Sequence, residues 1–377
     1  MIIPKNIGPK IALLVVASLI VVGCVNIIEL DNAGNQEHVV IFGKLTNARN
    51  YDQGFTIKRS NLNTRVELSY TDAEVVVFDD NTGASFDYEY SAEADRYVPV
   101  TSYFGTPGHA YRARVTVNGQ VYESSPQVMP MTNAEDSAYF RFERDKIITN
   151  AGATEQWRLK ILVKTNLPDT EEELFLRWNV DQVYILEETP LPTSSFPFYS
   201  PQVCYIFDGS ASDELVLFNG SLVKTNVIPE QEVADVPFDN SFINVRGYGV
   251  IQSSITREAA TYWERVIDVA DRSGSIFEVP PAPVPGNFQN LNDPNNAPLG
   301  FFEVAKMDTI GTSVIEDDHP IGLGMGMEYP NCDFMPSQFV TVPINCFECL
   351  RFFRVPDYCW NCTDFPNSTR KRPNFFF

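Results

Sequence analysis

Strict alternation of apolar and polar side chains is the feature that most limits how this chain can fold. The pattern is clearest over residues 109–117, where one face carries Tyr111, Ala113, Val115 and Val117. A repeat of two residues is typical of a β-strand with one buried face. The residues that follow, Asn118 and Gly119, separate this run from a second short one. Asn-Gly between two strands predicts a tight hairpin, because both turn positions need positive φ.

Six further runs between residues 38 and 125 predict strands. They are His38–Leu45, Phe55–Ser60, Glu74–Phe78, Ser85–Tyr90, Arg96–Val100 and Gln120–Ser124. Between two of them, Asp79–Gly83 predicts a solvated hairpin turn, since it lacks the alternating ligands and the distal Glu of a calcium loop. About seven strands in roughly 90 residues is the spacing of an immunoglobulin- or fibronectin-like β-sandwich. We therefore expect such a sandwich over residues 38–130, ending at Pro126 and Pro130.

Residues 131–377 predict a larger β-rich C-terminal domain. Its candidate strands are Trp157–Thr165, Glu173–Leu186, Glu214–Thr225, Ser241–Ile251 and Phe301–Lys306. One amphipathic helix interrupts them, because apolar residues repeat at helical spacing from Ala259 to Ala270. Thr256 can cap the start of this helix and Gly274 its end. An apolar stripe of this kind predicts a helix packed on a sheet rather than a cofactor site.

The first 23 residues have the pattern of a secretory leader. Lys5 and Lys10 are followed by the apolar run Ile11–Val22, which is shorter than the about 20 residues that a bilayer span requires. The run ends in Val21-Val22-Gly23-Cys24, which resembles the lipobox of bacterial lipoproteins. A plain secretory signal or a signal anchor is the alternative interpretation. The lipobox predicts a signal peptide at 1–23, acylation of Cys24 and a lipid-anchored tether at 24–37.

Six cysteines lie beyond the lipobox. They are Cys204, Cys332, Cys346, Cys349, Cys359 and Cys362. The last four form a CxxC-x9-CxxC pattern, but zinc ribbons place about 15–20 residues between such pairs. An even number of cysteines in an exported chain favours disulfides over a metal site, and the 15 pairings of six cysteines cannot be separated by sequence. We expect a disulfide-rich C-terminal tail, with zinc as the alternative.

Charge and motifs argue against several classes of function. The 49 acidic and 28 basic residues give a net charge of −21, whereas nucleic-acid binding needs a basic surface. The chain has no G-x-S-x-G elbow, no H-E-x-x-H, no P-loop and no G-x-G-x-x-G. Asp317-Asp318-His319-Pro320 could supply metal ligands, although such clusters are more commonly solvated turns. We therefore predict neither a catalytic residue nor a metal site or cofactor, while a spatial pair of carboxylates leaves no sequence signal.

Two short patterns suggest modification. Asp136-Ser137-Ala138 and Asp308-Thr309-Ile310 match the Asp-Ser/Thr-aliphatic triplet of Bacteroidetes O-glycosylation. Ser137 and Thr309 are accordingly the candidate attachment sites, although such triplets also arise by chance.

Four features in a fixed order carry a resemblance to a known family. The first is the lipobox with the run Val39–Asn47, and the second is Ala73–Asp80 with Gly108–Tyr111 and Gly119–Ser124. The third is the Tyr262-Trp263 helix followed by Ser275–Phe277, Pro280–Ala282, Gly286-Asn287 and Gly300–Phe302. The fourth is Cys359–Cys362 with Lys371–Phe375. Together they resemble the Bacteroidetes outer-membrane lipoprotein family of unknown function, DUF4249. The chain departs from it in the tail, which usually reads closer to Lys-Pro-Asp-Phe-Trp, and in the extra Cys346/Cys349 pair.

The resemblance implies a function without naming catalytic residues. Members are outer-membrane lipoproteins commonly associated with TonB-dependent transporters, so we expect a non-catalytic, cell-surface accessory protein that captures ligand for such a β-barrel. An envelope adhesin or structural spacer is the main alternative, and a surface hydrolase a further one. Aromatic residues gather in Ser195–Tyr205 and Phe347–Trp360, and the proline-rich Pro190–Pro201 and Pro280–Pro285 predict long loops. These aromatic segments are the candidate binding surface.

Overall fold

The computed structural model describes most of the chain between residues 37 and 376. The described residues are 37–48, 53–61, 66–149, 152–169, 173–188, 202–211, 215–222, 226–239, 242, 245–272, 283–321, 358 and 361–376. Within them the fold is mainly β, as the alternation predicts, with one α-helix. The predicted leader, Cys24 and most of the tether lie outside the described residues, as do Gly274 and Pro190–Pro201.

The N-terminal strands form the first unit, which we call the first sandwich. They are β1 (Glu37–Thr46), β2 (Gly54–Asn61), β3 (Val66–Ser69), β4 (Glu74–Asp79), β5 (Ser85–Ser91), β6 (Arg96–Pro99), β7 (Ala110–Val117), β8 (Gln120–Ser124) and β9 (Gln127–Val128). All seven strands predicted in this region are confirmed, whereas β3 and β9 were not predicted. The hydrogen-bonded order is β8-β7-β4-β5-β6-β2-β1. β6 makes the corner between two layers, because it pairs with β2 only at Phe55 and Tyr97.

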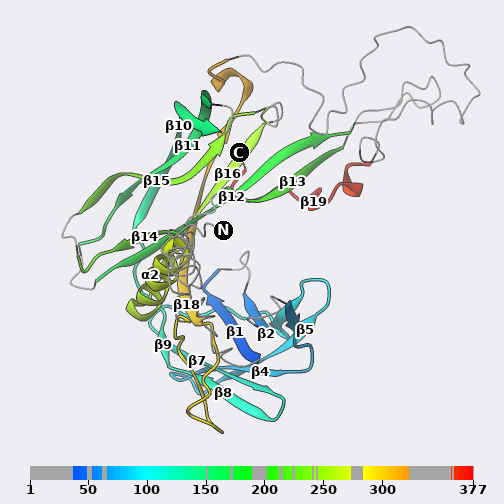
Figure 1. Ribbon diagram of the computed structural model, residues 1–377, viewed down its shortest axis with the longest axis vertical. Coiled ribbons are helices and arrows are strands. Elements are labelled where there is room, and N and C mark those ends of the chain that lie inside the picture. Colours follow the sequence, from blue (N-terminus) through cyan, green and yellow to red (C-terminus); the bar gives the residue numbers. More distant parts are fainter. Residues whose placement is uncertain are drawn as a thin grey trace, which may run out of the picture.

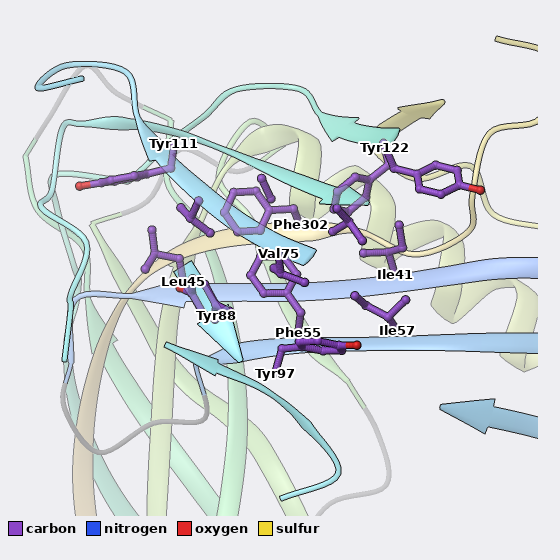
Figure 2. Close-up of a cluster of buried hydrophobic side chains, with 14 of the residues drawn as sticks. Ile41, Leu45, Phe55, Ile57, Val75, Tyr88, Tyr97, Tyr111, Tyr122 and Phe302 are labelled. Carbon is purple, nitrogen blue, oxygen red and sulfur yellow. The ribbon is translucent and has the colours of Figure 1, made fainter. Parts of the chain in front are cut away.

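The core of the first sandwich lies between these two layers (Figure 2). Alternation on β7 buries Tyr111, Ala113, Val115 and Val117, as the sequence predicts. From the opposite layer, Phe55 on β2 lies 5.1 Å from the Tyr88 ring centroid. Burial of such rings removes a large apolar area from water, and this is the main contribution to the stability of a small sandwich.

The remaining strands form a second, larger unit, the second sandwich. They are β10 (Glu135–Thr149), β11 (Gly152–Asn166), β12 (Phe175–Glu187), β13 (Val203–Ser210), β14 (Val216–Asn219), β15 (Val227–Pro237), β16 (Arg246–Ile255), β18 (Phe302–Val314) and β19 (Ser368–Thr369). β10, β11 and β15 make one sheet, which faces the β18-β16-β12-β13 sheet. Leu159, Ile161 and Val163 of β11 pack between them against Leu176 and Trp178 of β12 and their neighbours.

β18 belongs to both sandwiches, which the sequence did not predict. Phe302–Ala305 pair in parallel with β1, and Lys306–Val314 pair antiparallel with β16. Figure 1 shows β18 in orange running from the N-terminal strands below to the long strands above. Just before it, β17 (Phe288–Asn290) pairs with β8, so the chain returns to the first sandwich after residue 287. The strand order therefore joins one sheet of the second sandwich to the strands of the first, while β10, β11 and β15 stay a separate sheet.

The predicted local turns are confirmed. Asn118 and Gly119 have φ values of 51° and 72°, as a tight Asn-Gly hairpin requires. In the other turn, the Asp79 carboxylate accepts hydrogen bonds from the backbone N–H of Asn81 and Thr82 at 2.9 and 3.1 Å. Burial of Asp79 opposes ionisation, but its bonds to His109, Thr82 and Asn81 outweigh that effect and lower its pKa.

The predicted helix is also confirmed, as α2 (Arg257–Arg272). The Thr256 hydroxyl accepts the Ala259 N–H at 3.1 Å, which is the expected N-cap. Ala259 and Tyr262 pack with Phe175, Ile251 and Phe301. The apolar stripe thus serves to pack the helix against the sheet, beside the junction of the two sandwiches (Figure 1).

A disulfide holds the C-terminal segment to β13. Cys204 and Cys362 are joined, with an S–S distance of 2.01 Å. The 3-10 helix η5 (Cys362–Asp364) follows, and β19 pairs with β13 at Tyr205 and Ile206. The Glu188 carboxylate is buried and accepts the Cys362 N–H at 3.2 Å and an Arg370 N–H at 3.1 Å. Cys332, Cys346, Cys349 and Cys359 lie outside the described residues.

Candidate functional site

A cleft with a volume of about 620 Å³ lies between the two sandwiches. Its walls come from β1, β2 and β6 of the first sandwich, from β12, β13 and β16 of the second, and from the shared β18. Trp263 of α2 also lines it. Ligand sites commonly occupy 300–1,000 Å³ at such junctions. This cleft is the candidate functional site.

The first sandwich presents the outer face of β1 and β2 to the cleft. Ile41 and Leu45 point into the core, and Phe42 and Lys44, offset by one residue, line the cleft. Thr56 of β2 is paired with Phe42 and lies on the same wall. Phe42 is 41% exposed, which is high for a phenylalanine on a strand. The alternation that builds the core therefore also sets an aromatic ring and an ammonium group on the wall of the cleft.

The second sandwich contributes a polar stripe from β12. Trp178 and Val180 are buried in the core, whereas Arg177, Asn179 and Asp181 line the cleft. Their spacing of two residues places them on one face of the strand. Phe207 of β13, 37% exposed, adds a second accessible aromatic ring.

A buried ion pair lies in the wall of the cleft. One Nη of Arg177 donates to Glu303 Oε1 at 2.7 Å, and the two side chains are only 7% and 4% exposed. Trp263 Nε1 donates to the other Glu303 oxygen at 2.6 Å, and the guanidinium lies 4.7 Å from the Trp263 ring centroid. Breaking a buried pair of this kind costs about 3–5 kcal/mol, because the remaining charge is left uncompensated. The Arg177–Glu303–Trp263 cluster is accordingly a fixed part of the cleft.

The cluster leaves part of the Arg177 guanidinium unused. The Nε–H of Arg177 is buried and has no hydrogen-bond partner. Both carboxylate oxygens of Glu303 are engaged, by Arg177 and Trp263. Lys44, Arg96 and Arg177 line the cleft with the carboxylates Asp181 and Glu303. Three cationic and two acidic side chains are therefore among the residues that line the cleft.

Of the described residues that the sequence nominated as disulfide, glycosylation or ligand-binding positions, none is among those that line the cleft. Cys204 and Cys362 are joined on β13 and the tail. Of the aromatic segments Ser195–Tyr205 and Phe347–Trp360, residues 202–205 and Tyr358 are described. Cys204 is buried, and Tyr358 packs edge-to-face on Phe365 at 5.0 Å.

The two glycosylation triplets lie on different kinds of surface. Ser137 of β10 is exposed. Its neighbour Asp136 accepts hydrogen bonds from Trp178 Nε1 at 2.8 Å and Thr165 Oγ1 at 2.6 Å, and burial raises the Asp136 pKa. The Thr309 hydroxyl is buried on β18. Modification at Ser137 and Thr309 stays a prediction.

The Asp317-Asp318-His319-Pro320 segment packs as a 3-10 helix, η2 (Glu316–Asp318), followed by a partly buried histidine. The His319 ring lies 5.2 Å from the Phe238 centroid and 6.2 Å from that of Phe242. Burial lowers the His319 pKa, although Glu316 and Asp318 favour its protonation. Across the described part of the chain, no three metal-ligating side chains gather in one place.

The cleft residues were missed because their roles depend on distant partners. Arg177 and Glu303 are separated by 126 positions. One local signal did exist: Arg177, Asn179 and Asp181 repeat at every second position in a strand that was predicted correctly. A charged face on an otherwise apolar strand indicates that this face either contacts solvent or lines a binding site.

No helix in the described part of the chain is long and apolar enough to cross a bilayer. A family model described as "Domain of unknown function (DUF4249)" matches residues 26–310. The matched region contains all residues that line the cleft. No curated protein and no solved structure matches the chain.

Proposed function

The chain belongs to the DUF4249 family, and from this premise we propose that it is a non-catalytic, ligand-capturing lipoprotein that serves a TonB-dependent transporter. In this proposal the leader 1–23 is removed and acylated Cys24 anchors the body to the outer membrane, facing the cell surface. The cleft then holds a small ligand and presents it to the β-barrel.

The observation that carries the proposal is the cleft itself. Its walls come from two sandwiches that share β18, so the cavity exists before any ligand arrives. A preformed site binds at lower entropic cost than one that must be assembled. Two accessible rings, Phe42 and Phe207, offer apolar contact, and the polar stripe of β12 offers orientation.

The chemistry of the lining favours binding over catalysis. Among the described side chains that line the cleft there is no Ser, Cys or His. Glu303 is held by Arg177 and Trp263, an arrangement suited to a fixed charge rather than to proton transfer.

Co-purification tests the proposal. The full-length chain, expressed in its native cells and solubilised in mild detergent, is expected to carry a TonB-dependent β-barrel that mass spectrometry identifies. Cys24→Ser is the matched control: it should leave the protein unacylated and reduce its recovery with the barrel. Recovery of the wild-type protein without any barrel, or of Cys24 without an acyl group, would contradict the proposal. Binding to surfaces or polymers with no barrel present would favour the adhesin.

A further inference from the structure

We infer that the cleft selects a small organic carboxylate with an aromatic body, and that Arg177 is the residue that determines this preference. The inference rests on the proposed capture function and names the ligand class of the same site. It depends on two properties of the cleft: the Nε–H of Arg177 that has no acceptor, and the position of the exposed rings.

Arg177 supplies the recognition geometry. A guanidinium has five N–H donors in a planar fork that matches a carboxylate. Glu303 accepts from one Nη, and the Nε–H has no acceptor. Trp263 lies over the guanidinium and holds its plane. A carboxylate bound against the edge of this guanidinium would complete its donor set, and Asn179 on the same face of β12 offers a neutral amide beside it.

The exposed rings indicate an aromatic body. Phe42 and Phe207 come from opposite sandwiches, and both line the cleft while remaining more than a third exposed. Exposed aromatic side chains of this kind commonly anchor ligands, because stacking adds to apolar burial. The volume of about 620 Å³ leaves room for a bicyclic ring with its substituents.

A matched pair of probes tests the inference. N-acetyltryptophan carries one carboxylate at neutral pH, and N-acetyltryptophanamide has nearly the same shape without the charge. Titration calorimetry on the full-length chain in mild detergent should show at least about tenfold tighter binding of the acid, as expected for a charge-assisted fork. Inorganic phosphate should not displace the acid, because it offers no ring.

Variants locate the binding. The double variant Arg177→Gln/Glu303→Gln removes both charges together, which avoids leaving one of them buried alone. It should lose the preference for acid over amide. Thr56→Trp should occupy the cleft and weaken the binding of both probes. Arg158→Gln/Asp235→Asn is the control, because this ion pair of 2.6 Å joins β11 and β15 and does not line the cleft; it should bind as wild type does.

The outcomes separate the inference from the proposed function. Equal binding of acid and amide, with both weakened by Thr56→Trp, would overturn the carboxylate preference and leave ligand capture standing. Failure of the acid to bind, or its full displacement by phosphate, would overturn the ligand class. Recovery with the β-barrel is measured separately and is unaffected by either result. A preference for the acid that disappears only in the Arg177/Glu303 double variant would support the inference.

Discussion

At the scale of the residue, the effect of an Arg–Glu ion pair on stability depends on how deeply the pair is buried. The Arg141–Glu230 pair on the surface is nearly half exposed on both sides, so water and salt screen it and it adds little to stability. The Arg177–Glu303 pair is almost fully buried, and neither partner tolerates loss of the other. Burial, which a sequence does not display, decides which charged residue belongs to a site.

His319 provides a prediction at this scale. Its folded pKa lies below its ordinary value because burial among Phe142, Phe238 and Phe242 disfavours the charged ring. The unfolded chain therefore binds the proton more readily than the folded one. Acidification through the unfolded pKa of about 6.5 should lower the free energy of unfolding, and the loss should be complete below the folded pKa.

The measurement is urea unfolding of the wild type and of His319→Gln between about pH 7.5 and pH 5. The wild type should lose more stability over this interval than the variant. An equal loss in both proteins would show that His319 does not titrate in this way.

At the scale of the element, helix α2 is fixed by a contact at its first turn. Thr256 accepts the Ala259 N–H and donates its own hydroxyl to Gln127 Oε1 at 2.7 Å. Gln127 is buried on β9, so the cap also ties the helix to the first sandwich. One hydroxyl therefore serves both helix initiation and docking.

Thr256→Ala should lower the free energy of unfolding by about 1–2 kcal/mol, because it removes the N-cap and the donor to a buried amide oxygen. Thr261→Ala is the matched control: its hydroxyl donates back to the Arg257 carbonyl within the helix, and its loss should change stability by less than about 0.5 kcal/mol. Chemical denaturation measures both. Equal effects of the two substitutions would contradict the role of Thr256.

At the scale of the whole molecule, β18 is the element that makes two sandwiches into one structure. Its first residues pair with β1 and the rest with β16. Gly300 precedes it with φ of 97°, and a Cβ there would overlap the Ile41 carbonyl, so the approach of β18 to β1 requires glycine. Such a shared strand couples the units and keeps the walls of the cleft in place.

The Cys204–Cys362 bond gives a prediction for the molecule as a whole. It links positions 158 residues apart, so it restricts the unfolded chain strongly. Cys204→Ala/Cys362→Ala should lower the free energy of unfolding by about 2–5 kcal/mol. Because β18 joins the sandwiches, we expect both to unfold in a single transition. The midpoint of this transition should shift in the double variant.

Urea unfolding without reductant tests this, and reduction of the wild type should reproduce much of the loss. Two separate transitions, of which only one shifts in the double variant, would contradict the coupling of the sandwiches through β18.

The sequence by itself determined what depends on near neighbours: seven strands of the first sandwich, the Asn118-Gly119 hairpin and the cap at Thr256. Period-two patterns, turn conformations and capping act over a few residues, so they are visible in the order of amino acids. Only the tertiary structure decided the division of β18, the return of β17 to β8, the pairing of Cys204 with Cys362 and the meeting of Arg177 with Glu303. These contacts join residues far apart in the chain, and their energies depend on burial that the whole fold creates.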